Sequence, residues 1–127
     1  MNLDGKHADL TTRIIGAAIE VHRHLGPGLL ESAYEECLCF ELSERNLVIV
    51  RQVPLPVVYK SVRLDCGYRM DVVVEGAVVL ELKCVDTVMP VHKAQLLTYL
   101  RLSGLRVGLI LNFHAETMRA GITRLIL

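Results

Sequence analysis

Apolar residues recur at helical spacing in the first third of the chain. The first stripe consists of Leu10, Ile14, Ala17, Ala18, Val21 and Leu25. Two glycines and a proline follow at positions 26–28, so the pattern predicts a helix from about residue 9 to residue 25. A second stripe, ending near Asn46, is Leu30, Ala33, Cys37 and Phe40, interleaved with Glu31, Glu35, Glu36, Glu41 and Glu44. This pattern predicts an amphipathic helix with an acidic outer face.

From Val48 the pattern changes to valine-rich segments separated by turn residues. They predict strands at residues 48–59, 68–74, 78–84 and 106–112. Pro54 and Pro56 cannot donate to a strand ladder, which places the first strand at a sheet edge or a bulge. The second and third strands are apolar on both faces, so we expect them at the centre of a sheet that helices cover on both sides.

The second half of the chain adds one crossover. Residues 91–103 predict a helix that ends at Gly104 and leads directly into the strand at 106–112. Residues 122–127 fit either a short strand or a segment docked on the core. No repeat or linker divides the sequence. We therefore expect a single α/β domain over residues 1–127, with a central mixed β-sheet flanked by helices on both faces (αβββαβ).

Composition and charge limit the partners rather than the fold. The chain has 127 residues, 52% of them hydrophobic, and its 14 Lys plus Arg balance 14 Asp plus Glu. Without a net charge to attract nucleic acid, any such contact must come from a local basic rim. No apolar stretch approaches the ~20 residues that span a bilayer, and the four cysteines have no secretory context. We expect a cytoplasmic protein with reduced thiols and no membrane contact.

Three charged side chains interrupt the apolar strand pair at residues 68–83. They are Asp71, Glu81 and Lys83, and the last two share one strand face because side chains alternate with period 2. Charged groups are rarely buried without a partner, since desolvating an isolated ion is costly. The pattern therefore indicates either a ligand site or a structural salt bridge within the sheet.

The turn between these strands decides whether the charged residues meet. A two-residue turn would place Asp71 and Glu81 on opposite faces of the sheet. A three-residue loop at residues 74–76, with Gly76 in the left-handed region, puts Asp71, Glu81 and Lys83 on one face. We predict this odd-numbered loop or an equivalent bulge.

These residues resemble the PD-(D/E)XK nucleases, with Asp71 as the first acid and Glu81-Leu82-Lys83 as the E-x-K element. Further matches narrow the resemblance to the GxxExxY family, whose naming motif is matched by Gly28, Glu31 and Tyr34. Other similar stretches are RQVPLP at residues 51–56, Tyr68-Arg69, and His92-x-x-Gln95-x-x-x-Tyr99-Leu100. The resemblance extends from Leu25 to Phe113, and it implies a restriction-endonuclease-like core and a nuclease function.

The resemblance also implies a site for Mg²⁺ or Mn²⁺. Its expected ligands are Glu31, Asp71 and Glu81, because hard cations prefer carboxylate oxygens. Lys83 would orient the attacking water or stabilise developing negative charge. Gln95 is expected to contribute to catalysis. The expected substrate contacts are Tyr34, Arg69, His92 and Tyr99.

Plainer roles stand beside these assignments. The alternative role for Glu31, at the start of a helix, is simple stabilisation of the helix N-terminus through the helix dipole. Tyr34 and Tyr99 are more typical of packing residues whose hydroxyls find a partner, and Gln95 fits a surface amide. The histidines and cysteines lack the spacing of zinc or iron–sulfur sites, so we expect neither.

Two functions follow from the sequence. The first is an Mg-dependent nuclease that hydrolyses phosphodiester bonds in DNA or RNA. The alternative is a catalytically silent nuclease-fold module for binding or assembly, which the neutral charge and small size allow. A homodimer is expected because a small core offers little substrate-binding surface. Without metal, the paired acids should raise the pKa of at least one carboxyl group.

Overall fold

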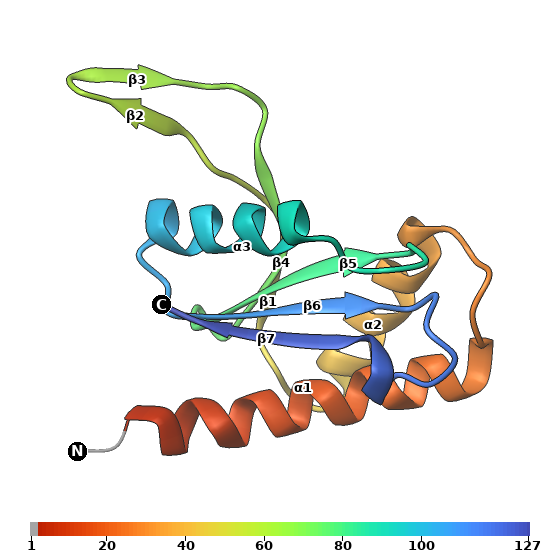
Figure 1. Cartoon of the computed structure of the whole chain (residues 1–127). Helices are drawn as coiled ribbons and strands as arrows, with labels where there is room; N and C mark the ends of the chain where they lie inside the picture. The colour runs from red at the N-terminus through yellow and green to blue at the C-terminus, as the bar shows by residue number, and fades with distance from the viewer. Residues whose placement is uncertain (1–2) are drawn as a thin grey trace.

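A computed structural model describes the backbone of residues 3–127 and the side chains from residue 7 onward. Its centre is a five-stranded sheet with the order β1-β4-β5-β6-β7, in which only β5 and β6 are parallel neighbours (Figure 1). The strands are β1 (Ile49–Pro54), β4 (Arg69–Val74), β5 (Val78–Lys83), β6 (Val107–Asn112) and β7 (Ile122–Ile126). The helices are α1 (Leu3–Leu25), α2 (Glu31–Glu44), α3 (Pro90–Ser103) and a short 3-10 helix, η1 (Arg119–Gly121).

Alternating side chains build one apolar layer on each face of the sheet. Val72, Leu80 and Leu109 belong to the layer packed with α1 and α2. Val79 and Ile110 belong to the layer packed with α3. Figure 1 shows α3 and α1 on opposite sides of the sheet. The predicted α/β fold, with a mixed sheet between helices, is confirmed.

Helix α3 lies close to β6 because Gly108 has no side chain. A Cβ atom at Gly108 would meet the Leu96 side chain at 2.8 Å, and Leu96 is fully buried. The helix ends at Gly104, whose φ of 76° is in the left-handed region, as the sequence predicted. This close packing fixes the helix that carries Gln95 and Tyr99 over the sheet.

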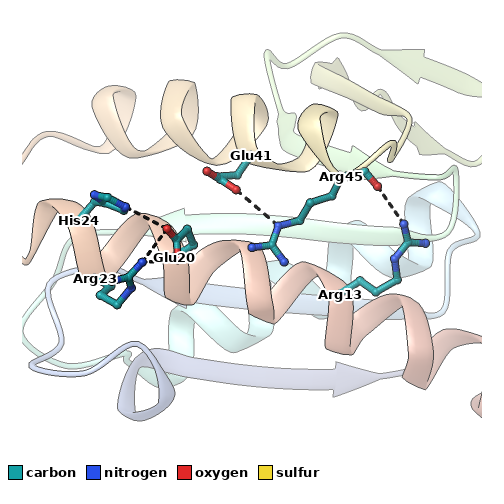
Figure 2. A network of polar contacts seen from close by, with 6 residues as sticks. All are labelled: Arg13, Glu20, Arg23, His24, Glu41 and Arg45. Carbon is teal, nitrogen blue, oxygen red and sulfur yellow. Dashed lines mark hydrogen bonds and ion pairs between the residues drawn. The ribbon is translucent and has the colours of Figure 1, made fainter.

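The first two helices pack on each other, and a hydrogen bond on their outer surface links α1 to the end of α2 (Figure 2). Arg13 donates a hydrogen bond to the carbonyl oxygen of Arg45, which itself pairs with Glu41. Helix α1 begins at Leu3, earlier than predicted. In the described part of the chain, no helix combines the length and apolar character needed to cross a bilayer.

The predicted inner face of α2 was wrong. Leu30 and Phe40 are 76% and 63% exposed, whereas Tyr34, Leu38 and Leu42 are fully buried. Apolar residues lie on more than one side of this helix, so periodicity alone did not identify the side that packs. As a consequence, Glu35, which was assigned to the acidic outer face, points inward and is buried.

The predicted strand at 48–59 is two strands. After β1 the chain leaves the sheet and forms a separate hairpin of β2 (Val57–Tyr59) and β3 (Val62–Leu64), which projects beyond α3 in Figure 1. Strand β3 was not predicted because all three of its side chains are exposed and it shows no buried alternation. Strand β1 lies at a sheet edge, as its prolines indicated, and residues 122–126 form the opposite edge strand.

The turn between β4 and β5 has the predicted odd length. Val74 pairs with Val78, so the loop is residues 75–77, one residue later than predicted. Glu75 and Gly76 both adopt left-handed backbone conformations, with φ of 55° and 60°. Continued through the strands, this register sets Asp71 opposite Glu81 on the same face.

Candidate functional site

Asp71 and Glu81 lie where the main-chain pairing of β4 and β5 stops. The backbone register between the strands covers residues 72–74 and 78–80. Beyond it, side chains bridge the gap: the Asp71 amide donates to Glu81 Oε1 at 3.3 Å, and the Leu82 amide donates to Asp71 Oδ2 at 2.9 Å. Each carboxylate is thus held by the backbone of the opposite strand.

This arrangement makes ionisation of the pair costly. Burial and the charge of Asp71 raise the pKa of Glu81 to about 8, and Glu81 is only 5% exposed. Burial also raises the pKa of Asp71, with smaller contributions from the charges of Glu35 and Glu31. The raised carboxyl pKa expected from the sequence is therefore present in this geometry.

Lys83 follows two residues later, at the end of β5, on the same strand face as Glu81. Its charge lowers the pKa values of Asp71 and Glu81, so its ammonium group lies near both. Among the described side chains, however, Lys83 forms no ion pair with either acid. The salt-bridge interpretation of these three residues therefore lacks its defining contact.

The donor set fits a hard divalent cation. Mg²⁺ commonly takes one or two protein carboxylates and completes its shell with water and substrate phosphate. Asp71 and Glu81 supply two carboxylates whose mutual repulsion a cation would relieve. Within the described side chains, no group of three His, Cys, Asp or Glu residues converges on a metal position. Glu31 is thus near Asp71 without completing a three-carboxylate set.

Helix α3 borders the same site. The Gln95 side-chain amide donates to the Tyr99 hydroxyl at 2.8 Å. Burial raises the pKa of Tyr99, and the charges of Glu81 and Asp71 add to the effect, so Tyr99 lies near both acids. Gln95 is therefore not an isolated amide, because it is hydrogen-bonded to a tyrosine that lies within range of both acids' charges.

Two other predicted substrate contacts, Arg69 and His92, have different environments. Arg69 is exposed at the start of β4, on the same strand face as Asp71. His92 accepts a hydrogen bond at Nδ1 from the Met89 amide at 2.9 Å, which caps the start of α3. His92 therefore has a structural role in this geometry.

Tyr34 is corrected from a substrate contact to a packing residue. Its side chain has no exposed surface and stacks on Phe113, with ring centroids 4.6 Å apart. Its hydroxyl donates to the Gly26 carbonyl and accepts from the Leu29 amide. Tyr34 thus fastens the loop before α2 to the core, as the plainer interpretation held.

A polar cluster around the buried Glu35, beside the site, was missed by the sequence interpretation. Glu35 Oε2 accepts from the Arg51 guanidinium at 2.8 Å, and Glu35 Oε1 accepts from the Gln52 amide at 2.8 Å. Gln52 has a φ of 51°, a strained conformation in the strand next to Asp71. Arg51 and Gln52 belong to the stretch at residues 51–56 that resembles the GxxExxY family. That resemblance was the sequence signal that could have identified them.

Asn112 was also missed. It is 4% exposed, and its amide exchanges hydrogen bonds with both the N–H and the carbonyl of Val85. These bonds tie the segment after Lys83 to the end of β6. They therefore help to fix the position of Lys83 at the end of β5.

Comparison with known proteins identifies the family. The family model described as "PD-(D/E)XK nuclease superfamily" matches residues 8–125. No curated protein and no solved structure matches the chain. The matched segment contains β1, β4, β5 and β6, all but the last residue of β7, and helices α2 and α3.

Proposed function

Because the chain belongs to the PD-(D/E)XK nuclease superfamily, we propose that it hydrolyses phosphodiester bonds of DNA or RNA with a divalent cation held by Asp71 and Glu81. The observation that carries the proposal is the pair of neighbouring carboxylates at the end of β4 and β5, each of which accepts a hydrogen bond from a backbone amide of the opposite strand. The cation would be Mg²⁺ or Mn²⁺. When bound, it supplies charge neutralisation at the phosphate and acidifies water.

The remaining roles follow from position. Lys83 has no ion-pair partner among the described residues, so its ammonium group is free to orient water or to stabilise negative charge at the phosphate. Gln95 and Tyr99 line the α3 side, where a hydroxyl and an amide can position the substrate. Glu31 would act through its charge or as a further ligand once a cation draws the acids together.

Within the superfamily, we propose membership of the GxxExxY family. The motif residues have separable physical roles in this chain. Gly28 has a φ of 108°, which side chains rarely tolerate, and Glu31 is the first residue of α2. Tyr34 fastens the same loop through its hydroxyl. The motif therefore shapes the loop that presents Glu31 towards the site.

The test is cleavage by purified protein of labelled single-stranded and duplex DNA and RNA, with Mg²⁺ or Mn²⁺. We expect cutting that chelation stops and that Lys83→Met lowers by about 100-fold or more, the usual effect of losing an oxyanion stabiliser. Cutting that persists unchanged in Glu81→Ala protein would come from a contaminant and would defeat the assignment. Unaltered cellular function in Lys83→Met protein would favour the non-catalytic binding module.

Two further expectations remain predictions. A homodimer would enlarge the small surface that each chain offers to a nucleic acid, and sedimentation of the purified protein measures it. A cytoplasmic location is tested by fractionation of the cells that make the protein.

A further inference from the structure

An apolar groove runs beside the candidate site, between α3 and the chain that leads out to the β2–β3 hairpin. We call it the α3 groove, and its volume is about 520 Å³. Its lining includes Val57, Tyr68, Val91, Gln95, Tyr99 and Leu102. Most of these side chains are apolar, and Gln95 and the tyrosine hydroxyls are the polar groups among them.

The α3 groove adjoins the candidate site through Tyr99. Tyr99 lines the groove and is close enough to Glu81 and Asp71 for their charges to act on its hydroxyl. Gln95, also in the lining, is hydrogen-bonded to that hydroxyl. A molecule in the groove would therefore lie next to the Tyr99 hydroxyl, and so close to the two carboxylates.

The elements around the groove are basic, although the whole chain is neutral. Helix α3 and the segment 57–70 carry five cations and a single acid, Asp65; the cations are Lys60, Arg63, Arg69, Lys93 and Arg101. Within the part of the chain that the structure describes, none of these five enters an ion pair. Helix α2, on the other side of the sheet, has five glutamates and no base. The charge balance therefore hides two faces of opposite sign.

We propose that the α3 groove binds an unpaired nucleobase, so that the substrate is a single-stranded nucleic acid or a single-stranded segment of one. The proposal rests on the proposed nuclease function. A base is a flat apolar ring with a polar edge, which matches an apolar groove that carries one amide. The basic surface of α3 and the hairpin suits the phosphates on either side.

Tyr68 is the residue that the proposal singles out for stacking. It is 45% exposed and meets the Tyr99 ring edge to face, with centroids 6.2 Å apart and an angle of 64°. The contact with Tyr99 holds the Tyr68 ring in place while nearly half of its side chain stays open to a ligand. A base inside a duplex is already stacked on its neighbours, so only an unpaired base can reach the groove.

A second apolar groove, on the surface of α1 and α2, provides a matched control. It is lined by Phe40 and Leu25 and rimmed by Glu20, Glu36 and Glu41. Each of these glutamates is paired with an arginine, so the cations at this rim are already engaged and offer little attraction to a phosphate backbone. An exposed aromatic ring thus lies on each side of the molecule, and only Tyr68 has a basic surround.

The experiment measures binding without turnover. Fluorescence anisotropy in EDTA follows the full-length protein with labelled oligothymidylate, oligouridylate, an abasic strand of equal length, and a duplex. We expect wild-type protein to bind at least one of the two base-bearing single strands more tightly than the abasic strand and the duplex. Whether oligothymidylate or oligouridylate binds better shows which of these two strands the groove prefers.

Tyr68→Ala should weaken binding of the base-bearing strand roughly tenfold, the usual cost of one lost stack. It should leave abasic binding unchanged, and Tyr68→Phe and Phe40→Ala should bind as wild type does. Ala94→Trp, which fills the groove from the exposed side of α3, should reproduce the loss. Equal affinity of wild-type protein for abasic and base-bearing strands, or wild-type binding by both Tyr68→Ala and Ala94→Trp, would overturn the proposal.

The outcome separates from that of the nuclease test. Suppose that the wild-type protein binds bases, that Tyr68→Ala loses this binding, and that the wild-type protein shows no metal-dependent cleavage. The base-binding role of the α3 groove would then stand, and the hydrolytic function would be rejected. If Glu81→Ala abolishes cleavage while Tyr68→Ala and Ala94→Trp leave binding unchanged, the nuclease function would stand. The base-binding role of the α3 groove would be rejected.

Discussion

The ionisation of Glu81 is strongly coupled to folding. Its pKa is about 8 in the folded protein and about 4.5 as a free side chain. Between these values the folded protein holds a proton that the unfolded chain has lost, so stability must fall as pH rises through that window. Each unit of pKa shift corresponds to ~1.4 kcal/mol, so the total is on the order of a few kcal/mol.

Metal-free protein should therefore melt at progressively lower temperature as the pH is raised from about 5 to 8. Glu81→Gln, a neutral residue of the same shape, should flatten this profile and melt above wild type at the upper end. Calorimetry in EDTA measures both curves. Glu116→Gln, at an exposed carboxylate, should retain the wild-type slope. A flat wild-type profile would mean that Glu81 is ionised at low cost.

Among single residues, the sequence singled out the candidate acids Asp71 and Glu81 but not the neighbouring Glu35. Asp71, Glu81 and Lys83 stand out because charges interrupt two apolar strands. Glu35 does not stand out, because it is one of five glutamates in a single helix and its burial depends on how that helix is rotated. Sequence spacing could not supply that rotation.

Among the elements, α2 and β1 are joined through one arginine. Arg51 donates to Glu35, whose side chain is 11% exposed, and to Glu36, whose side chain is 68% exposed. Removing Glu35 leaves Arg51 and Gln52 without a buried acceptor, whereas removing Glu36 costs only a solvent-screened contact.

Glu35→Ala should consequently lower the free energy of unfolding by about 1–3 kcal/mol, whereas Glu36→Ala should leave it nearly unchanged because its contact is screened by solvent. Urea denaturation of the two variants beside wild type gives the comparison. Because both acids bind the same guanidinium, equal losses would show that burial does not distinguish them.

The elements that the sequence predicted best are those with one strong local cause. Gly104 ends α3, the prolines place β1 at an edge, and the valine runs mark the central strands. The hairpin of β2 and β3 was missed because it packs too little surface to leave a pattern. The β4–β5 loop has the predicted odd number of residues, which places Asp71 and Glu81 on one face. It lies one residue later in the chain than predicted.

For the whole molecule, the zero net charge conceals an acidic face and a basic face. Lys93 and Arg101 on α3 have no ion-pair partner among the described residues, whereas on α1 Arg23 pairs with Glu20 and Arg13 is hydrogen-bonded to the Arg45 carbonyl (Figure 2). A nucleic acid that runs along α3 would release counterions there and not along α1.

Lys93→Ala/Arg101→Ala should lower the slope of log affinity against log salt by about 1.4 for a single strand, because each phosphate contact contributes about 0.7. Arg13→Ala/Arg23→Ala should leave the slope unchanged. Anisotropy titrations over a range of salt concentrations measure the slopes. A larger loss in the α1 pair would place the nucleic acid on the other face.

The central claim is that Asp71 and Glu81 hold a divalent cation, and its test combines charge removal with metal addition. When both are ionised, two carboxylates at ~5 Å and an effective dielectric of ~20 repel by about 3 kcal/mol, and Lys83 offsets only part of this. A cation bound to the folded state alone stabilises it by RT ln(1 + [L]/Kd), about 2.7 kcal/mol at 100 times Kd. Asp71→Asn removes one charge of the pair and one ligand.

The decisive measurement is the melting temperature of wild-type and Asp71→Asn protein by calorimetry, in EDTA and across a titration of Mg²⁺ or Mn²⁺. The account predicts that wild-type protein gains stability with metal concentration, and that Asp71→Asn is at least as stable in EDTA while losing most of that gain. A wild-type protein that does not respond to metal, or an Asp71→Asn variant that responds equally, would contradict the metal site and return these residues to a structural role.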